Sequence, residues 1–191
     1  NNMCYEEDFW MTYRKIYLDG IVDDNQATHV NAMLHMLSES KSPVYLYISS
    51  IGGDFGAGYS IIDQMGISPF PVYTIVRGQA CSMAAIIAAY GEPGCRFITE
   101  NSCMMIHDIS ISAENEVLGS HKMALEYYGK AFSNQISQLS KRMKCPAETL
   151  RQLMSSTCWM NAKEAIKIGI VDGLWTKKLE RSAIKREKAD C

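Results

Sequence analysis

The sequence predicts a single α/β domain in which strands are sandwiched by helices. Three observations indicate this class. Apolar residues switch repeatedly between the two-residue spacing of strands and the spacing of one helical face. No linker, repeat or low-complexity segment divides the 191 residues. With 47% hydrophobic and 21% charged residues, the chain can bury a core, which excludes a disordered or fibrous protein.

The first half of the chain alternates helices and strands. Apolar residues at helical spacing from Val30 to Leu37 predict the first helix, and short β-branched or aromatic runs predict the strands. In chain order, the predicted elements are a helix at 26–37, a strand at 44–48, a glycine-rich turn at 52–56, a helix at 57–65, a strand at 71–76, a helix at 83–89, and strands at 95–98 and 103–106.

The second half is mainly helical. A long helix from about residue 116 to residue 143 is predicted by one stripe of apolar residues: Leu118, Leu125, Phe132, Ile136, Leu139 and Met143. Pro146 suits the first turn of the next helix, which should end near residue 154. Asn161, with Glu164 three residues later, predicts a helix N-cap, and Gly169 predicts the end of that helix. Residues 170–171 predict a short closing strand.

Charge and cysteine usage exclude several classes of protein. The net charge of −2 and the pI near 6.1 provide no overall basic field for nucleic acid. The only basic concentration is the tail, residues 177–191, which acidic residues dilute and which we expect to be a solvated end. The seven cysteines form no C-x-x-C pair, so neither a disulfide framework nor a zinc knuckle is predicted.

Targeting signals are also missing from the sequence as given. The longest nearly apolar stretch, residues 80–90, is far shorter than the ~20 residues of a membrane span. The acidic first residues are unlike a secretory signal. We therefore expect a soluble, cytoplasmic protein that binds neither nucleic acid nor a membrane and needs no cofactor or metal.

Ser82 is the first candidate for chemistry. It lies where a predicted strand passes into a predicted helix, within residues 78–83 (GQACSM). Free backbone amides at a helix start favour developing negative charge, which suits a nucleophile. The segment lacks the G-x-S-x-G pattern of a nucleophile elbow, however, and a serine in this position is commonly a helix cap. Both interpretations stay open on this segment alone.

His107 is the second candidate. It follows the apolar strand 103–106 and could act as a general base, although a histidine at a strand end is more commonly a satisfied core or edge residue. The neighbouring Asp108 is poorly placed to orient its ring, because adjacent residues of a strand point to opposite faces.

Three segments occur in order along the chain: residues 49–53 (SSIGG), 78–83 (GQACSM) and 101–107 (NSCMMIH). Ser82 follows Gly53 by 29 residues and precedes His107 by 25. In motif and spacing these segments resemble the signature of the ClpP family, the serine peptidase core of ATP-dependent proteases. The resemblance extends from about residue 14 to about residue 172, nearly the whole chain.

The resemblance implies a fold and a set of roles. The fold would be a ClpP/crotonase-like β-α-β spiral with a long protruding handle helix, forming one peptidase domain over residues 1–191. Residues 1–13 would be an N-terminal segment and residues 107–143 the handle region. Ser82 would be the nucleophile that attacks a peptide carbonyl, and His107 the general base. The backbone amides of Gly53 and Met83 would form the oxyanion hole.

The resemblance also implies an assembly and a substrate. Members of the family are endopeptidases that cut unfolded polypeptides inside homo-oligomeric heptameric rings, stacked in pairs and fed by an AAA+ unfoldase. This sequence contains no G-x-x-x-x-G-K-[ST] nucleotide loop, so ATP use would belong to the partner. Residues 109–116 (ISISAENE) lack the glycines of the family's handle segment, but the alternation of Ile109 and Ile111 still predicts an exposed strand edge.

The third position of the catalytic triad departs from the family. Counting back from Ala162, the family's Arg-Asp pair falls on Ser156 and Thr157. Thr157 could accept a hydrogen bond from the His107 ring, but it lacks the charge that stabilises an imidazolium. Hydrogen bonds to charged groups contribute ~1.5–3 kcal/mol, so we expect a rate loss of roughly tenfold to a hundredfold. Ser156 and Asn161 remain possible substitutes. Asp172 is expected to be a turn residue.

Two alternative functions follow from the same residues. One is a structural or regulatory ring subunit with weak or no catalysis, favoured by the loss of the Arg-Asp pair and opposed by the retention of Ser82, His107 and Gly53. The other is an acyl-CoA enzyme of the crotonase superfamily, which shares the β-α-β spiral. That enzyme would need carboxylate acid and base groups in place of Ser82 and His107, and the chain is short for it.

Overall fold

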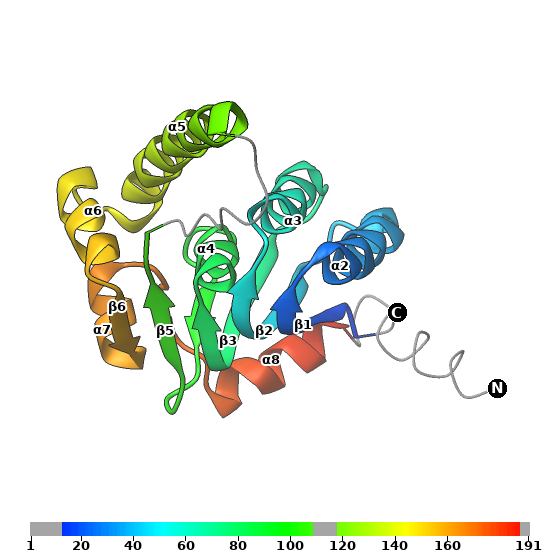
Figure 1. Cartoon of the computed structure of the whole chain (residues 1–191). Coiled ribbons are helices and arrows are strands. Elements are labelled where there is room, and N and C mark those ends of the chain that lie inside the picture. The colour runs from blue at the N-terminus through cyan, green and yellow to red at the C-terminus, as the bar shows by residue number, and fades with distance from the viewer. Residues whose placement is uncertain (1–12, 109–117, 188–191) are drawn as a thin grey trace.

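The computed structural model describes residues 13–108 and 118–187. Figure 1 shows one twisted sheet with α2, α3, α4 and α5 on one side and α8 on the other. The strands are β1 (Lys15–Val22), β2 (Val44–Gly53), β3 (Val72–Cys81), β4 (Arg96–Ile98), β5 (Cys103–Ile106), β6 (Cys158–Asn161) and β7 (Gly173–Leu174). The helices are α2 (Asp24–Met36), the short 3-10 helix η1 (Leu37–Glu39), α3 (Phe55–Ile67), α4 (Met83–Ala89), α5 (Leu118–Met143), α6 (Ala147–Ser155), α7 (Ala162–Ile168) and α8 (Lys177–Glu187). The predicted mixed α/β class is confirmed.

Strand β3 is the branch point of the sheet. Its first half pairs in parallel with β4 (Thr74 opposite Arg96), and its last residues pair in parallel with β5 (Cys81 opposite Met105). The main path of the sheet is β1-β2-β3-β4-β7, and β6 adds to the far side of β5 in the antiparallel direction. The carboxyl end of β3 is therefore placed beside the carboxyl end of β5.

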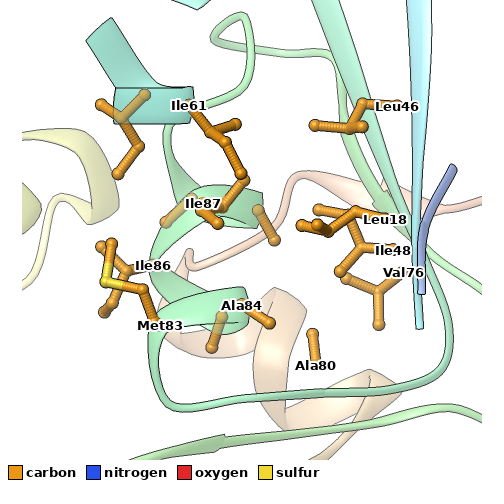
Figure 2. Packing of buried hydrophobic residues seen from close by; sticks show 14 of the residues in the cluster. Leu18, Leu46, Ile48, Ile61, Val76, Ala80, Met83, Ala84, Ile86 and Ile87 are labelled. Carbon is orange, nitrogen blue, oxygen red and sulfur yellow. The ribbon is translucent and has the colours of Figure 1, made fainter. Parts of the chain in front are cut away.

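The core lies between the sheet and helices α2 to α4. All seven residues of α4 are buried, which is why this helix consists only of methionine, alanine and isoleucine. Figure 2 shows Met83, Ala84, Ile86 and Ile87 of α4 among the apolar side chains of the core. A short, wholly apolar helix needs this burial, because it is too short to be stable by itself in water.

Helix α5 is 26 residues long and confirms most of the stripe predicted for it. The described side chains of the predicted stripe are buried: Phe132, Ile136, Leu139 and Met143. The side chains of Leu118 and Leu125 lie outside the described residues, as do residues 109–117 and with them the predicted strand edge at Ile109 and Ile111. Within the described part of the chain, no helix is long and apolar enough to cross a membrane.

The basic tail is not a solvated end, contrary to the sequence expectation. Its described residues, 177–187, form α8, whose Ala183 is buried against Tyr45 and Tyr47 on the outer face of the sheet. Glu180 accepts hydrogen bonds from Lys15 Nζ (2.7 Å), Tyr47 Oη (2.6 Å) and Trp175 Nε1 (2.7 Å). Burial alone would raise the pKa of Glu180, but these hydrogen bonds hold it below its usual value. Glu180, one of the acidic residues of the tail, therefore attaches α8 to the sheet.

Local signals set several boundaries. Asn161 is the predicted N-cap of α7 and forms a capping box with Glu164, and Gly169 ends that helix at φ 81°. Two predictions were wrong in detail: Pro146 is the N-cap of α6 and precedes its first turn, and the closing strand lies at Gly173–Leu174, not at residues 170–171. Ile170 and Val171 are buried as core residues outside any strand, so their apolar character reflects packing. The sequence patterns also missed β1, whose pairing with β2 supplies the edge of the sheet.

Candidate active site

Ser82 lies in a tight turn between β3 and α4. Its backbone has φ 53° and ψ −125°, which is rare for a residue other than glycine and costs about 1–3 kcal/mol. The turn is fixed on both sides. The Ser82 N–H donates to Met105 O of β5 (2.7 Å), and the Ser82 carbonyl accepts from the N–H groups of Ala85 (3.0 Å) and Ile86 (3.2 Å). The geometry is that of a strained strand-to-helix turn that exposes a side chain.

The hydroxyl of Ser82 does not cap the helix. Helix α4 has no side-chain cap, and Ser82 Oγ lies 2.9 Å from Nε2 of His107. Both side chains are half-buried, so they can be reached from solvent. If Nδ1 carries the imidazole proton, Nε2 is free to accept the serine proton, which is the arrangement an activated nucleophile requires.

The branched sheet brings these two residues together. Cys81 and Met105 are parallel partners, and the Ser82 N–H bonds to Met105 O. His107 comes two residues later, just beyond the end of β5. The 24 residues between Ser82 and His107 form α4, β4, β5 and the loops that connect them, and they return the chain to the same point.

Met83 has a backbone N–H available for an oxyanion. It is the first residue of α4, and the first N–H groups of a helix have no partner within it. Gly52 leaves this amide accessible: a Cβ at Gly52 would lie 2.5 Å from Cys81 O, 2.7 Å from Ser82 Cβ and 3.0 Å from Met83 N. Gly53 ends β2 at φ 155°, and a Cβ there would collide with the Val22 carbonyl. Both glycines are therefore required on steric grounds.

Gly52 is a residue that sequence reasoning missed. The family resemblance implies a role for Gly53 alone, and the sequence pattern predicts only a glycine-rich turn at residues 52–56. The structure shows that Gly52, at φ 88°, is the glycine that packs against the Ser82 turn. The available signal was the doubled glycine at the end of a strand, which indicates close approach of another backbone segment.

The thiol of Cys81 is not a competing nucleophile. Cys81 precedes Ser82 and is only 3% exposed. Burial, followed by the nearby Cys103, raises the pKa of the Cys81 thiol. A buried, protonated thiol is inert, so the reactive group of this turn is the hydroxyl of Ser82.

Thr157 lies at the end of the β5–β6 ladder where His107 also lies. The last antiparallel pair is Ile106 and Cys158, and His107 follows Ile106 as Thr157 precedes Cys158, so an extension of this register would pair the two residues. The carbonyl of Met154, at the end of α6, accepts both the Asp108 N–H (3.0 Å) and the Thr157 N–H (3.3 Å), which holds the two segments together. Thr157 is exposed, and the described residues show no hydrogen bond between its hydroxyl and the His107 ring.

Neither alternative to Thr157 is directed at His107. The Ser156 hydroxyl donates to the carbonyls of Gln152 (3.2 Å) and Leu153 (3.3 Å) in the last turn of α6. Asn161 is the register partner of Cys103, four residues before His107, and its Oδ1 accepts the Glu164 N–H. Of the three residues considered for the third position, only Thr157 is in register with His107.

Asp172 is more than a turn residue, which corrects the sequence expectation. Its Oδ1 accepts from Arg96 Nη2 (2.6 Å), and its Oδ2 accepts from Arg96 Nε (2.9 Å), Arg96 N (3.0 Å) and Gly94 N (2.9 Å). Burial would raise the pKa of Asp172, but the hydrogen bonds and charge of Arg96 hold it below its usual value. This carboxylate fixes the segment before β7 to β4 and is committed to Arg96.

Comparisons with known proteins identify the family of this chain. Residues 5–178 match the family model described as Clp protease. The chain is 34% identical over 179 residues to the ATP-dependent Clp protease proteolytic subunit of Leuconostoc citreum (strain KM20), covering 90% of this chain and 88% of that protein. It is also 34% identical over 177 residues to the protein of the same name from Carsonella ruddii (strain PV), covering 86% of this chain and 85% of that protein. Together with the α/β fold and the pairing of Ser82 with His107, these matches show that the chain belongs to the Clp protease family.

Proposed function

We propose that this protein is a serine endopeptidase that cleaves unfolded polypeptides or peptides. The observation that carries the proposal is the 2.9 Å distance between Ser82 Oγ and His107 Nε2. The Ser82 hydroxyl is available for this contact because it does not cap helix α4. Membership of the Clp protease family supports a peptidase, and the geometry of this pair supports the serine type.

The mechanism follows from the positions of the groups. His107 Nε2 takes the proton of Ser82 as Oγ attacks the carbonyl carbon of the scissile peptide bond. The negative charge that forms on the carbonyl oxygen is stabilised by the backbone N–H groups of Met83 and Gly53. The protonated His107 then gives its proton to the leaving amine, which leaves an acyl group on Ser82. Water, activated by His107, hydrolyses this ester and restores the enzyme.

Thr157 is the proposed third member. Its hydroxyl would accept a hydrogen bond from Nδ1–H of His107 and so hold the ring in the tautomer that the mechanism needs. It offers no negative charge to the imidazolium. We therefore expect slower chemistry than a carboxylate would support, by roughly tenfold to a hundredfold.

The proposed assembly is a homo-oligomer of heptameric rings, stacked in pairs, with an AAA+ unfoldase as partner. The two relatives are named proteolytic subunits of ATP-dependent proteases, which supports a separate ATPase. The full sequence has no G-x-x-x-x-G-K-[ST] loop of its own. Two stacked seven-membered rings of a 21.4 kDa chain would have a mass of about 300 kDa by light scattering, and a species at the monomer mass would contradict the ring.

We also propose a cytoplasmic, reducing location. It is supported by the free thiols of the described cysteines: Cys81, Cys95, Cys103, Cys145 and Cys158.

A second candidate function is a ring subunit with little or no catalysis. The observation that favours it is the uncharged, exposed Thr157 in register with His107. The strained backbone of Ser82, at φ 53° and ψ −125°, argues against this second function, because a subunit without catalysis does not need a non-glycine residue in this conformation.

Hydrolysis of an unfolded protein and of a short fluorogenic peptide by the purified chain separates the two candidates. The peptidase proposal predicts turnover that disappears in Ser82→Ala. This change removes one half-buried hydroxyl group, and we expect it to leave the fold intact. Turnover that persists unchanged in Ser82→Ala, or no turnover by the assembled wild-type protein, would contradict it.

A further inference from the structure

Gly58 is placed where a glycine is unfavourable. It is the fourth residue of α3 (Phe55–Ile67), and glycine within a helix costs about 0.5–1 kcal/mol relative to alanine. Its backbone is an ordinary helical one, because Gly58 is not among the glycines with positive φ. Conformational freedom therefore does not explain this residue, and the explanation must lie in the space that a side chain would fill.

That space is occupied by Met83. A Cβ at Gly58 would overlap Met83 Cγ and would lie 2.6 Å from Met83 Cε and 2.8 Å from Met83 Sδ. Three atoms of one side chain thus cover the bare face of Gly58. Met83 is 4% exposed and belongs to the packed core (Figure 2). Protein cores are close-packed, so the methionine has little room to move aside.

Met83 is also the residue whose backbone N–H is a candidate oxyanion donor, because it is the first residue of α4. Two glycines of one short segment contact it from two directions: Gly52 leaves room for the amide nitrogen, and Gly58 leaves room for the side chain. Asp54, between them, fixes the segment, because its carboxylate accepts the Ala57 N–H (2.7 Å) at the start of α3 and its own N–H donates to Val22 O (2.7 Å).

We propose that Gly58 is a positioning residue for the oxyanion hole: by seating the Met83 side chain against α3, it fixes the direction of the Met83 N–H. This inference rests on the proposed peptidase function. Overlap with Cγ cannot be relieved by bending the end of the methionine chain, since Cγ is attached directly to Cβ. A methyl group at residue 58 must therefore rotate Met83 about its first side-chain bond or move the start of α4 away from α3.

The test is the steady-state hydrolysis of a fluorogenic peptide by the purified full chain carrying Gly58→Ala. Removing an oxyanion donor outright lowers kcat by about 10²- to 10³-fold, so a displaced donor should lower kcat by about tenfold or more. KM should stay within about twofold of the wild type, because an oxyanion contact is made mainly in the transition state. Partial unfolding would also lower the apparent kcat at unchanged KM, so kcat is calculated per folded chain, with the folded fraction of each variant measured by circular dichroism.

Gly66→Ala is the matched control. Gly66 lies in the same helix, and a Cβ there meets nothing within 4 Å. This variant makes the same chemical change to α3 without touching Met83, and its kcat should equal that of the wild type. A loss in Gly66→Ala as large as in Gly58→Ala would mean that α3 tolerates no alanine, and would overturn the inference.

A second background keeps the test decisive if Gly58→Ala does not fold. Met83→Ala removes Cγ, Sδ and Cε, the three atoms that a Cβ at Gly58 would meet, but it keeps the backbone N–H. The double variant Gly58→Ala/Met83→Ala should fold and match the kcat of Met83→Ala within about twofold. A double variant that is unfolded, or that loses a further tenfold or so relative to Met83→Ala, would overturn the inference. So would Gly58→Ala with the wild-type kcat.

The outcomes also distinguish this inference from the function on which it rests. Turnover by the wild type and by Gly66→Ala, with unchanged kcat in Gly58→Ala, contradicts the role of Gly58 alone. No turnover by the wild type contradicts the peptidase proposal and the role of Gly58 with it.

Discussion

Ser82 and Thr157 both have a positive φ, 53° and 54°, which is uncommon for residues other than glycine, yet their surroundings are opposite. The Ser82 turn is enclosed by Gly52 and its N–H is bonded to Met105 O. Thr157 is exposed, and its N–H is held by a longer bond of 3.3 Å to Met154 O. A β-branched residue is especially unfavourable at positive φ.

This difference indicates which part of the site is fixed and which can change. The strain at Ser82 is offset by the packing and hydrogen bonds around it, so the nucleophile and the Met83 amide are held together as one unit. The strain at Thr157 has few described contacts to offset it. Left-handed backbone is adopted more readily by aspartate and asparagine than by threonine. The positive φ at residue 157 thus suits aspartate or asparagine better than the threonine present.

The largest effect is expected from breaking the rigid part of the site. Gly52→Ala should lower peptide hydrolysis by about a hundredfold or more, because its Cβ would press on Cys81 O, Ser82 Cβ and Met83 N together. The measurement is kcat/KM on a fluorogenic peptide.

Gly20→Ala is the control for that variant. Gly20 has φ 83°, close to the 88° of Gly52, but a Cβ there meets nothing within 4 Å. In both variants, alanine in left-handed backbone lowers the free energy of unfolding by about 1–2 kcal/mol, but only Gly52→Ala crowds Ser82. Equal activity losses in the two variants would contradict the role assigned to Gly52.

An intermediate effect is expected from the exposed part of the site. Thr157→Asp should raise kcat by roughly tenfold to a hundredfold, because a carboxylate in register with His107 stabilises the imidazolium that forms during catalysis. Thr157→Asn relieves the same backbone strain without adding charge. It should therefore gain stability to thermal unfolding without the gain in kcat. If Thr157→Asp were no faster than Thr157→Asn, the third position would lie elsewhere.

The smallest effect on activity is expected at Asp172, the carboxylate already committed to Arg96. Asp172→Asn should leave kcat unchanged and lower the free energy of unfolding at neutral pH by about 2 kcal/mol, because Arg96 is buried and loses its counter-charge. Since the folded-state pKa of Asp172 is lowered, its stabilisation is complete above the unfolded-state pKa near 3.8 and is lost as the pH falls through the folded value.

Denaturant unfolding of the wild type and Asp172→Asn at a series of pH values measures this contribution. The two curves should differ at neutral pH and converge in strong acid. A loss of kcat in Asp172→Asn at neutral pH would mean that the Asp172 carboxylate supports catalysis by His107. That result would contradict the assignment of Asp172 to Arg96 and of the third position to Thr157.

Most of the fold and half of the site could be predicted from the sequence, for physical reasons. Periodicity and cap signals found helices α2 to α7 and strands β2 and β3 but missed β1 and α8, and the capping box of α7 is a purely local signal. The role of Gly52 and the opposition of His107 and Thr157 could not be derived from local pattern, because they depend on pairing between segments far apart in the chain. The attachment of α8 was missed for the same reason: Glu180 finds Lys15 and Tyr47 only after folding.

The central claim is that His107 activates Ser82 although no carboxylate occupies the third position. Reaction of the purified protein with a fluorophosphonate probe, followed by intact mass, tests it most directly. The account predicts one adduct per chain, absent in Ser82→Ala and formed at least about a hundredfold more slowly in His107→Ala. Absence of an adduct in the assembled wild-type protein from about pH 6 to about pH 9 would contradict the claim and favour a ring subunit without catalysis.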